Sequence, residues 1–524
     1  MNTRLPKEFL DVVLENNGLK QYLSVLSRGR QATPRSWLYE QQEPEKVRDK
    51  WLSILESLDG GSPEEKNVYH FDTSQLEKWG PQGEVAPIAD LMDIVNEGFS
   101  RADAPQPEAF TSKEWAAAKQ TVRNHLSRLR LSLRPAAYKH VVDDMRARDT
   151  LESNSGWPLF TRRNKPEVIS QSIADAESGR WKTYPAIALF RNYNLKTRLV
   201  WMFPMSANLV EGSFLQPLQS KLMTTEDPYW RAYLSPWKGF DEVRQSLTEA
   251  YESGRSLAAS DFSSTDAHFL AHHTSEVCDV IEVAFQPSYR EALRDVMLHM
   301  HQIPLVISKD EMITGEHGVS SGSNWTNFVE TIFDIIFQEY VKLCGVELDP
   351  SPVIGDDMSW NMPQYSDAFA EELEQLGEKV GHVINASKTT NEPDRVKFLQ
   401  RLFQRGYSRP DRELRGVYPT VRALKSLLYP ERFHKPKDWS TDMFCARTYM
   451  ILENCVDHPL FEEFVKFVVN GHSELIPFAK KSSGVIDRIH RESKLLPGLN
   501  PTYNQERRDS ALSSFESIKY ARTL

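Results

Sequence analysis

The centre of this 524-residue chain, residues 240–405, alternates between the apolar spacing of helices and that of strands. Helices are predicted at 241–253, 267–284, 289–300, 325–340 and 365–377. Strands are predicted at 256–260 and 379–384, as a hairpin over 305–315, and as two short strands flanking Gly355-Asp356-Asp357. Mixed order of this kind predicts an α+β fold in which helices back an antiparallel sheet.

The two ends of the chain differ from this centre. Residues 1–110 contain short helical patterns broken by glycines and prolines, and we expect a peripheral segment packed on a main body. Beyond about residue 410 the pattern is helical, with helices predicted at 418–428, 441–454, 460–469 and 485–495. The polar tail from Pro497 is expected to be loosely held. At about 100–200 residues per domain, the length predicts three domains or one multi-lobed domain.

Charge is distributed unevenly along the chain. The formal net charge of −10 would ordinarily count against a nucleic-acid partner, because phosphate backbones attract positive surfaces. However, residues 111–200 hold 17 bases against 8 acids, whereas residues 41–100 hold 13 acids against 5 bases. Residues 346–394 are acidic as well, with 11 acids against two lysines. These counts predict a basic lobe beside an acidic one, so the bulk charge does not exclude RNA or DNA.

Cysteine usage and hydropathy indicate the compartment. The four cysteines form no CxxC pair, which suits a reducing environment and excludes a fold built on disulfides. The N-terminus lacks the apolar core of a signal peptide, and no run of about 18 apolar residues predicts a membrane span. We therefore expect a soluble intracellular protein, or one enclosed in a particle assembled inside a cell.

Four carboxylates stand near predicted strand ends. Asp261 ends the strand in SLAASDFSSTDAHF and Asp266 follows five residues later. Asp356 and Asp357 follow Gly355, which permits a tight hairpin turn. If the two strands are neighbours, Asp261 and Asp356 meet at one sheet edge, where adjacent carboxylates repel unless a cation lies between them. Such oxygen ligands suit Mg²⁺ or Mn²⁺, and two such ions can support an in-line phosphoryl transfer.

Residues 318–330, GVSSGSNWTNFVE, open the long apolar helix with a small polar loop. Backbone and hydroxyl donors of residues 320–324 could hold a sugar or a phosphodiester. The alternative is an ordinary helix N-cap supplied by Ser323 or Asn324. Each of these signals is weak alone, since DxxxxD spacings and GDD turns occur in many unrelated chains.

Together, the segments have the order and spacing of motifs A, B and C of viral RNA-dependent RNA polymerases. DFSSTD resembles motif A, SGSNWTN resembles motif B, and GDD is the usual motif C of that family. Four further stretches are similar to motifs G, F, D and E: SNSGWPLFTRRNK (153–165), NLKTRLVWMFP (194–204), INASKTT (384–390) and the hairpin RVKFLQRLF (395–403). The resemblance covers about residues 150–405, and it looks most like the polymerases of picobirnaviruses and related partitiviruses, small segmented double-stranded-RNA viruses.

The resemblance implies roles for the matching residues. Asp261 and Asp356 match the invariant metal ligands, with Asp357 as an auxiliary ligand. Lys388 is a candidate general acid for the pyrophosphate leaving group. The positions implied in nucleotide binding are Lys196, Arg198, Arg191, Asp266, Ser321, Gly322, Thr326 and Asn327. Those implied in RNA binding at the template entrance are Gly156, Trp157, Pro158, Arg162 and Arg163. Trp157 and Phe160 would either stack on template bases or fill a core.

One position departs from the family pattern. Many relatives carry an asparagine four residues after the motif B threonine, where it helps to read the ribose. Here that position is Glu330, while Asn327 directly follows Thr326. We expect Asn327 to partner Asp266, the residue that senses the ribose 2′-hydroxyl. The alternative role for Asn327 is a structural helix contact.

The resemblance also implies a right-hand polymerase. The expected domains are an N-terminal extension over 1–110 that braces fingers and thumb, fingers over 111–250, a palm over 251–405 with a fingers insertion near 285–315, and a thumb with C-terminal tail over 406–524. The implied cofactor is Mg²⁺, with Mn²⁺ possible. The implied partners are RNA template and product, ribonucleoside triphosphates and a viral capsid protein, without a membrane. The implied location is the virion interior and the host-cell cytoplasm.

Two rivals remain. A reverse transcriptase shares a palm with two metal carboxylates, but it should carry a bulky aromatic gate in motif A and a tyrosine-led motif C, where this chain has Asp266 and GDD. A catalytically inactive RNA-binding or packaging protein with a polymerase fold is the second. The presence of Asp261, Asp356 and Lys388 argues against it.

Overall fold

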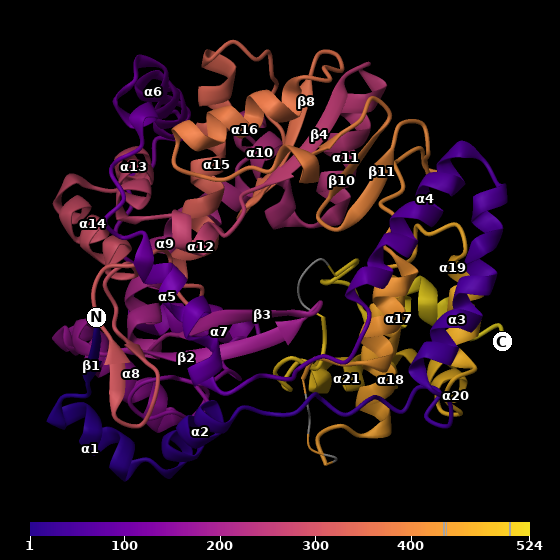
Figure 1. Ribbon diagram of the computed structural model, residues 1–524, viewed down its shortest axis with the longest axis horizontal. Helices are drawn as coiled ribbons and strands as arrows, with labels where there is room; N and C mark the ends of the chain where they lie inside the picture. Colours follow the sequence, from indigo (N-terminus) through magenta and orange to yellow (C-terminus); the bar gives the residue numbers. More distant parts are fainter. Residues whose placement is uncertain (433–434, 436, 502–504) are drawn as a thin grey trace.

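The computed structural model describes the chain except for residues 433–434, 436 and 502–504. Its elements form a ring in Figure 1, with the helices of the first 30 residues at the lower left and the central sheet at the top. The C-terminal helices lie at the right, and the N-terminal segment runs along the bottom of the ring to join them. Among the described residues, no helix has the length and apolarity needed to cross a membrane.

A four-stranded sheet, with the strand order β7-β8-β4-β9, forms the top of the ring. Its strands are β4 (Ser256–Asp261), β7 (Val353–Ile354), β8 (Asp357–Met362) and β9 (Thr390–Asn391), and all neighbouring pairs are antiparallel. The predicted hairpin of β10 (Arg395–Phe398) and β11 (Arg401–Gln404) is present as a separate two-stranded sheet. The first five residues of β4 are buried, as expected of a central strand of small and apolar residues.

Helix α15 (Trp325–Leu343) backs this sheet and is buried along almost its whole length. Phe337 on α15 packs against Trp360 of β8, with ring centroids 5.8 Å apart. The Gln338 side chain donates a hydrogen bond to the Ser359 carbonyl at 2.6 Å. Phe333 packs on its other side against Trp115 of α6 (Lys113–Ser127). The predicted α+β layer of helices on an antiparallel sheet is therefore confirmed.

A second, five-stranded sheet has the order β1-β6-β5-β2-β3. Its strands are β1 (Asn2–Arg4), β2 (Ala186–Tyr193), β3 (Lys196–Met202), β5 (Leu305–Val306) and β6 (Glu311–Ile313). The predicted hairpin at 305–315 is present, and the chain's first strand pairs with it. The long β2–β3 hairpin turns at Asn194 and Leu195, both with positive φ, and points towards the C-terminal helices in Figure 1.

Helices surround both sheets. Besides α6, α15 and the helices of the C-terminal core described next, they are α1 (Lys7–Glu15), α2 (Asn17–Arg28), α5 (Met92–Ser100), α7 (Tyr138–Ala147), α8 (Pro166–Ser178), α9 (Met205–Thr224), α10 (Pro228–Lys238), α11 (Phe240–Glu252), α12 (Thr265–His268), α13 (Ala271–Ile281), α14 (Arg290–His299) and α16 (Phe369–Lys379).

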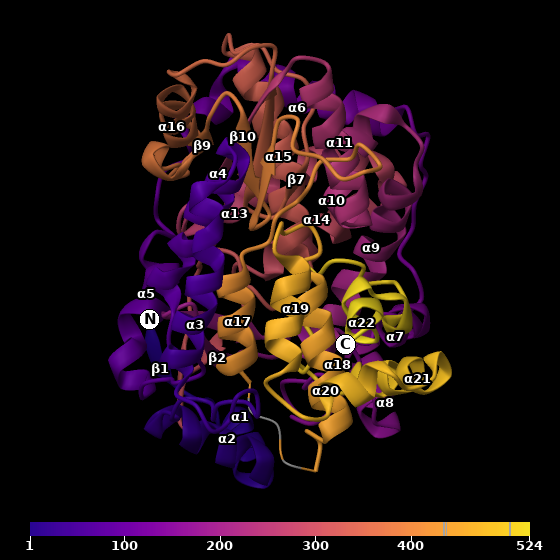
Figure 2. The same ribbon diagram turned by 90° about the vertical axis from the view of Figure 1, so that its right-hand side faces the viewer.

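The C-terminal helices share a separate hydrophobic core with part of the N-terminal segment. They are α17 (Thr420–Leu428), α18 (Thr441–Glu453), α19 (Phe461–Val469), α20 (Leu475–Ala479), α21 (Ser483–Ser493) and α22 (Glu516–Ala521). Helices α3 (Pro44–Leu55) and α4 (Pro63–Thr73) lie beside them in Figure 2. The buried Trp51 indole of α3 donates a hydrogen bond to the Thr420 hydroxyl at 2.8 Å. The first 110 residues therefore contact both sides of the ring.

Two predicted elements are wrong. The strand predicted at 379–384 is absent, because α16 continues to Lys379 and a turn at Gly381 (φ +78°) follows it. Ile384 packs on Gly377 of α16, so the apolar residues of this stretch serve a helix end and a loop. The fourth strand of the sheet is β9 instead. The single helix predicted at 267–284 is two helices, α12 and α13, since the His273 ring accepts a hydrogen bond from the Leu270 N–H and caps a new helix.

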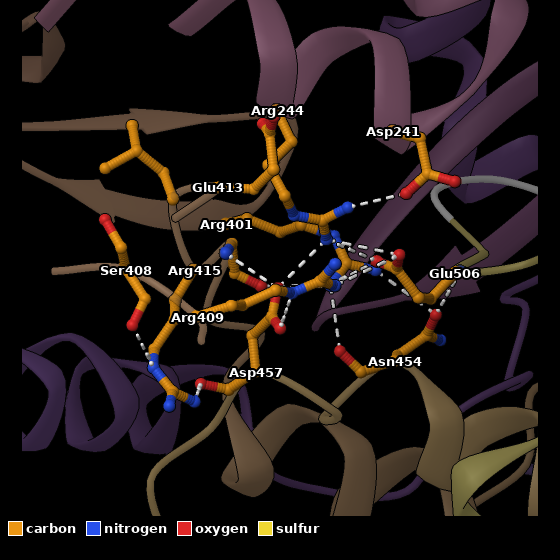
Figure 3. Close-up of polar contacts among 12 residues, drawn as sticks. Asp241, Arg244, Arg401, Ser408, Arg409, Glu413, Arg415, Asn454, Asp457 and Glu506 are labelled. Carbon is orange, nitrogen blue, oxygen red and sulfur yellow. Dashed lines mark hydrogen bonds and ion pairs between the residues drawn. The ribbon is translucent and has the colours of Figure 1, made fainter. Parts of the chain in front are cut away.

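The described part of the C-terminal tail, residues 497–501 and 505–524, is not loosely held, contrary to expectation, and residues 502–504 lie outside the described structure. Leu512, Phe515 and Ile518 are buried in the C-terminal core. The Glu506 side chain is only 3% exposed and belongs to a buried ion cluster, shown in Figure 3, of Arg244, Arg401, Arg409, Asp457 and Glu506. The tail looked polar in sequence because its charged partners lie far away along the chain, on α11 and β11.

Candidate active site

Three aspartates meet where β4 ends and β8 begins. Asp261 and Asp357 are directly opposite each other in the ladder, and the Phe262 N–H donates to the Asp356 carbonyl at 3.3 Å. Gly355 makes the turn with a φ of +57°, which a side-chain-bearing residue rarely adopts. The expected adjacency of the two strands, and with it the meeting of their acidic ends, is confirmed.

These carboxylates repel one another. Burial raises the pKa of Asp357 well above its usual range, and the charges of Asp356 and Asp261 raise it further. Burial and the charge of Asp261 also raise the pKa of Asp356. A hydrogen bond that the Thr265 hydroxyl donates at 3.3 Å lowers this pKa and so opposes the rise. The pKa of Asp261 is raised by burial, while the charge of Lys388 opposes this effect. A cation at this site would remove the repulsion.

The donor set fits a divalent metal bound together with substrate. Within the described residues, no group of three or more His, Cys, Asp or Glu side chains is gathered closely enough to hold a metal ion alone. Mg²⁺ characteristically keeps several waters and binds through one or two carboxylates plus substrate phosphates. The exposed Asp261 and the half-buried Asp356 suit this mode of binding.

The ribose-reading pair expected from the sequence is not joined by a hydrogen bond in the described structure. Asn327 is exposed, and its side-chain nitrogen lies by the Gly355 turn, 3.1 Å from where a Cβ there would be. Desolvation of the Asp266 carboxyl among its neighbours raises its pKa to about 7, with further contributions from the charges of Asp356 and Glu97. Glu330, at the departing position, is buried, and its pKa is raised by burial and next by Asp266.

The polar loop before α15 packs against β3. The Ser321 hydroxyl accepts a hydrogen bond from the Trp201 N–H at 3.1 Å. A Cβ on Gly322 would lie 1.7 Å from the Trp201 carbonyl oxygen, so close backbone approach requires glycine here. Thr326 donates to the Ser320 carbonyl at 2.6 Å. The alternative role of this loop, an ordinary helix N-cap, is also partly present, because the Ser323 hydroxyl accepts a hydrogen bond from the Trp325 N–H at 3.1 Å.

Glu211 on α9 holds this loop from behind and was missed in the sequence. It accepts hydrogen bonds from the Ser323 hydroxyl and from the Asn324 N–H at 3.1 Å. Burial raises its pKa to about 7, although these hydrogen bonds oppose the shift. Asn208 donates to Glu211 at 3.0 Å and accepts from Arg163 at 2.8 Å. A lone acid within the apolar run ANLVEGSFL was the available signal.

Asp334 is a second missed acid, one turn beyond Glu330 on α15. It is fully buried, and neither carboxylate oxygen has a hydrogen-bond partner in the described structure. Burial is the main cause that raises the pKa of Asp334 well above the usual range, and the charges of Glu330 and Asp356 raise it further. The sequence showed only an apolar stripe interrupted by two acids at i, i+4 spacing. Asp334 therefore adds a buried acid behind the site.

The basic residues of the β2–β3 hairpin divide into two groups. Arg198 lies with its guanidinium carbon 4.1 Å from the Tyr193 ring centroid, and its charge lowers the pKa of Asp356. Lys196 is exposed, and its charge lowers the pKa of Asp261. Arg191 instead makes a bidentate ion pair with Glu431, at 2.7 and 2.8 Å.

The predicted RNA-binding segment is partly structural. Trp157 is 2% exposed and packs on Phe9 with ring centroids 5.0 Å apart, which matches the core alternative. Gly156, with φ +67°, is buried against the Phe203 carbonyl, and Pro158 is half-buried. Arg163 is held by Asn208, as described above. Arg162 is exposed, 3.6 Å from Glu152, and is more accessible than Arg163.

Comparisons with known proteins agree with this geometry. Residues 194–432 match the family described as "Viral RNA-dependent RNA polymerase". The chain is 27% identical over 515 residues to a "Potential RNA-dependent RNA polymerase" of a human picobirnavirus, covering 94% of this chain and 91% of that protein. It is 22% identical over 194 residues to an "RNA-directed RNA polymerase" of Cryptosporidium parvum virus 1, covering 35% and 36% of the two chains.

Solved structures agree as well. The crystal structure of the RNA-dependent RNA polymerase of a human picobirnavirus superposes with a TM-score of 0.82 at 23% identity, covering 99% of this chain and 100% of that one. An insertion-loop deletion mutant of such a polymerase superposes with a TM-score of 0.81 over the same shares.

Proposed function

This chain belongs to the viral RNA-dependent RNA polymerases and has their right-hand fold, and on that premise we propose that its three adjacent aspartates catalyse template-directed RNA synthesis. The substrates are ribonucleoside triphosphates, and the product serves transcription and replication of a viral RNA genome. The observation that carries this proposal is the meeting of Asp261 with Asp356 and Asp357 at one edge of the four-stranded sheet. Acids brought together there repel, and a divalent cation relieves that repulsion.

Asp261 and Asp356 would hold the metal ions, Mg²⁺ or Mn²⁺, with Asp357 as an auxiliary ligand. When bound, such ions lower the pKa of the attacking 3′-hydroxyl and stabilise the leaving pyrophosphate. Lys388 is exposed within electrostatic reach of Asp261, where it can give a proton to the leaving group. Positioning and charge account for most of the catalysis in this mechanism.

The incoming nucleotide would lie between the hairpin and the sheet. Lys196 and Arg198 would hold the triphosphate, and Arg191 would support the hairpin through Glu431. Asp266 would sense the ribose 2′-hydroxyl, aided by Ser321, Gly322, Thr326 and Asn327 in the loop before α15. Arg162, with the backbone of Gly156 and Pro158, would border the template entrance.

We assign the domains as an N-terminal extension over 1–110, fingers over 111–250, a palm over 251–405 with a fingers insertion near 285–315, and a thumb over 406–524. Contacts of α1–α2 and of α3–α4 with opposite sides of the ring support a bracing role for the extension. RNA template and product are the macromolecular ligands, and a capsid protein is the proposed partner in the virion interior. The host-cell cytoplasm is the second proposed location of RNA synthesis.

Incorporation of labelled ribonucleotides on a defined RNA template, with Mg²⁺ or Mn²⁺ and with EDTA, tests the proposal. We expect metal-dependent synthesis by the wild type and none by Asp356→Asn, with an unchanged circular dichroism spectrum. Near-wild-type synthesis by Asp356→Asn would overturn the site assignment. No synthesis by the wild type would favour an inactive packaging protein, and efficient use of deoxyribonucleotides would favour a reverse transcriptase.

A further inference from the structure

The tip of the β2–β3 hairpin docks on α17 through the N-terminal segment. Lys425 of α17 is 3% exposed and donates a hydrogen bond to the Asn194 side chain at the hairpin turn. Gln82 bridges the two elements: it accepts from the Asn194 N–H at 3.0 Å and donates to the Tyr429 carbonyl at 2.7 Å. Three segments that are far apart in sequence therefore meet at one place, between the hairpin and α17 in Figure 1.

Positive charge exceeds negative charge at this junction, where Glu77 is the one acid whose charge acts on Lys78. Lys78 ends a short 3-10 helix, Ser74–Lys78, that packs on α17, and Arg198 and Arg422 come from β3 and α17. All three side chains are partly exposed. None of them forms an ion pair with a carboxylate anywhere in the described part of the chain. The nearby acid Glu431 is already held by Arg191.

The charges of these cations act on one another. Burial lowers the pKa of Lys78, and Arg422 and Arg198 lower it further, while Glu77 alone opposes them. The pKa of Lys425 is lowered to about 7, mainly by burial and next by the positive charges of Arg422 and Lys78. Like charges held together destabilise a fold unless an anion is bound between them. Lys78, Arg198 and Arg422 are partly exposed, so an anion can reach them from solvent.

Arg198 connects this junction to the active site, because its charge acts both on Asp356 and on Lys78. The hairpin that carries Arg198 also docks on α17 through the Asn194–Lys425 hydrogen bond, so a polyanion bound at Arg198 can extend along the hairpin towards the cations of the N-terminal segment and α17. The guanidinium groups are also pre-positioned: Arg198 lies 4.1 Å from the Tyr193 ring and Arg422 lies 6.0 Å from the Tyr418 ring. Stacked guanidinium groups lose less conformational freedom when they bind phosphate.

We propose that Lys78 and Arg422, together with Arg198, form a phosphate-binding site that extends the nucleotide and RNA surface of the proposed polymerase onto its N-terminal segment and α17. The ligand is the phosphate group, of the incoming triphosphate or of the RNA backbone. This inference rests on the proposed function for its ligand. It adds two residues that no polymerase motif in the chain contains.

The test uses the full-length chain with Lys78→Met and Arg422→Met, which remove charge and keep the aliphatic stem. Lys78→Arg and Arg422→Lys keep the charge. Lys309→Met, at the exposed turn of the β5–β6 hairpin, is the matched control. Each variant is measured for RNA affinity by fluorescence anisotropy over a salt series, and for the nucleotide KM and kcat in RNA synthesis at saturating template.

We expect the Met variants to lose about five- to tenfold in one of the two quantities, as for loss of a charge-assisted contact. Weaker RNA binding, with a salt slope smaller by about 1 and an unchanged KM, identifies backbone phosphate. A raised KM with unchanged kcat and RNA affinity identifies the triphosphate. Either result supports the site if the charge-keeping variants recover at least half of the loss.

Unchanged affinity and KM in both Met variants would overturn the proposal. So would a loss that also occurs in Lys78→Arg and Arg422→Lys with a lowered melting temperature, because it would assign these residues to packing alone. Failure of the proposed function gives a different result: the wild type and Lys309→Met would then synthesise no RNA. The anisotropy series needs no catalysis and would still report on the site.

Discussion

Asp261 and Asp357 face each other as a directly opposed pair across the antiparallel strands β4 and β8. Both have raised pKa values, and the charge of Asp261 contributes to the shift at Asp357. Like charges opposite each other on neighbouring strands destabilise a sheet by about 0.2–1 kcal/mol. Binding of a cation between these carboxylates would therefore stabilise this edge of the sheet.

Asp357→Asn is therefore expected to stabilise the metal-free protein by about 1 kcal/mol, because it removes one member of the opposed pair. The same change should reduce the extra stability that Mg²⁺ confers on the wild type. Thermal unfolding in EDTA and in Mg²⁺ measures both effects. Asp367→Asn, at an exposed position, serves as the control. A lower melting temperature of Asp357→Asn in EDTA would contradict the prediction.

Glu211 should make stability depend on pH. Its folded pKa of about 7 lies above the unfolded value of about 4.3, so the folded state holds an extra proton between these pH values. Between these pH values the free energy of unfolding of the wild type therefore falls as pH rises, by up to about 1.4 kcal/mol per pH unit from this group. Above about pH 8 the contribution of Glu211 no longer changes with pH.

Glu211→Gln should lack this dependence, so the variant gains stability relative to the wild type from pH 4.5 to 7. Unfolding in urea at a series of pH values measures the difference. Glu226→Gln, at a side chain that is 82% exposed, should parallel the wild type. Parallel curves for Glu211→Gln and the wild type would show that Glu211 is ionised in the folded protein throughout this range.

Breaking the buried ion cluster should be costly. Glu506→Gln leaves Arg244 and Arg401 without a charged partner from the tail, and loss of one member of a buried pair costs about 3–5 kcal/mol. Glu516→Gln removes an exposed pair with Lys519 and should cost less than about 1 kcal/mol. Chemical denaturation followed by circular dichroism compares them. Equal, small effects would mean that the tail is not held by this cluster.

Gly322→Ala should impair both folding and RNA synthesis. The new Cβ would lie 1.7 Å from the Trp201 carbonyl oxygen, and the loop or β3 would have to move. Overpacking of this kind costs about 1–3 kcal/mol. Gly60→Ala meets no atom within 4 Å and is the matched control. Melting temperature and nucleotide incorporation report the result, and an unaffected Gly322→Ala would show that the loop can leave β3 freely.

Local pattern alone was sufficient for the central strands and for most helices. The small apolar residues of β4, the GDD turn and the stripe of α15 each carry their structure within a few neighbouring residues. The order of the motifs then predicted that the ends of β4 and β8 meet, and they do. The strand predicted at 379–384 was wrong, although it rested on the same kind of local pattern. A helix end followed by a loop can show the alternating hydrophobicity that is typical of a strand.

The tertiary structure decided which distant partner each polar group finds. Arg244 meets Glu506 across 262 residues, and Arg191 meets Glu431 across 240, so neither pairing leaves a trace in local periodicity. The same holds for Glu211 behind the polar loop. Periodicity reports which side of an element is buried, whereas the partner depends on how several elements pack together. Sequence by itself therefore determined the fold class and the catalytic candidates, and packing determined what holds and surrounds them.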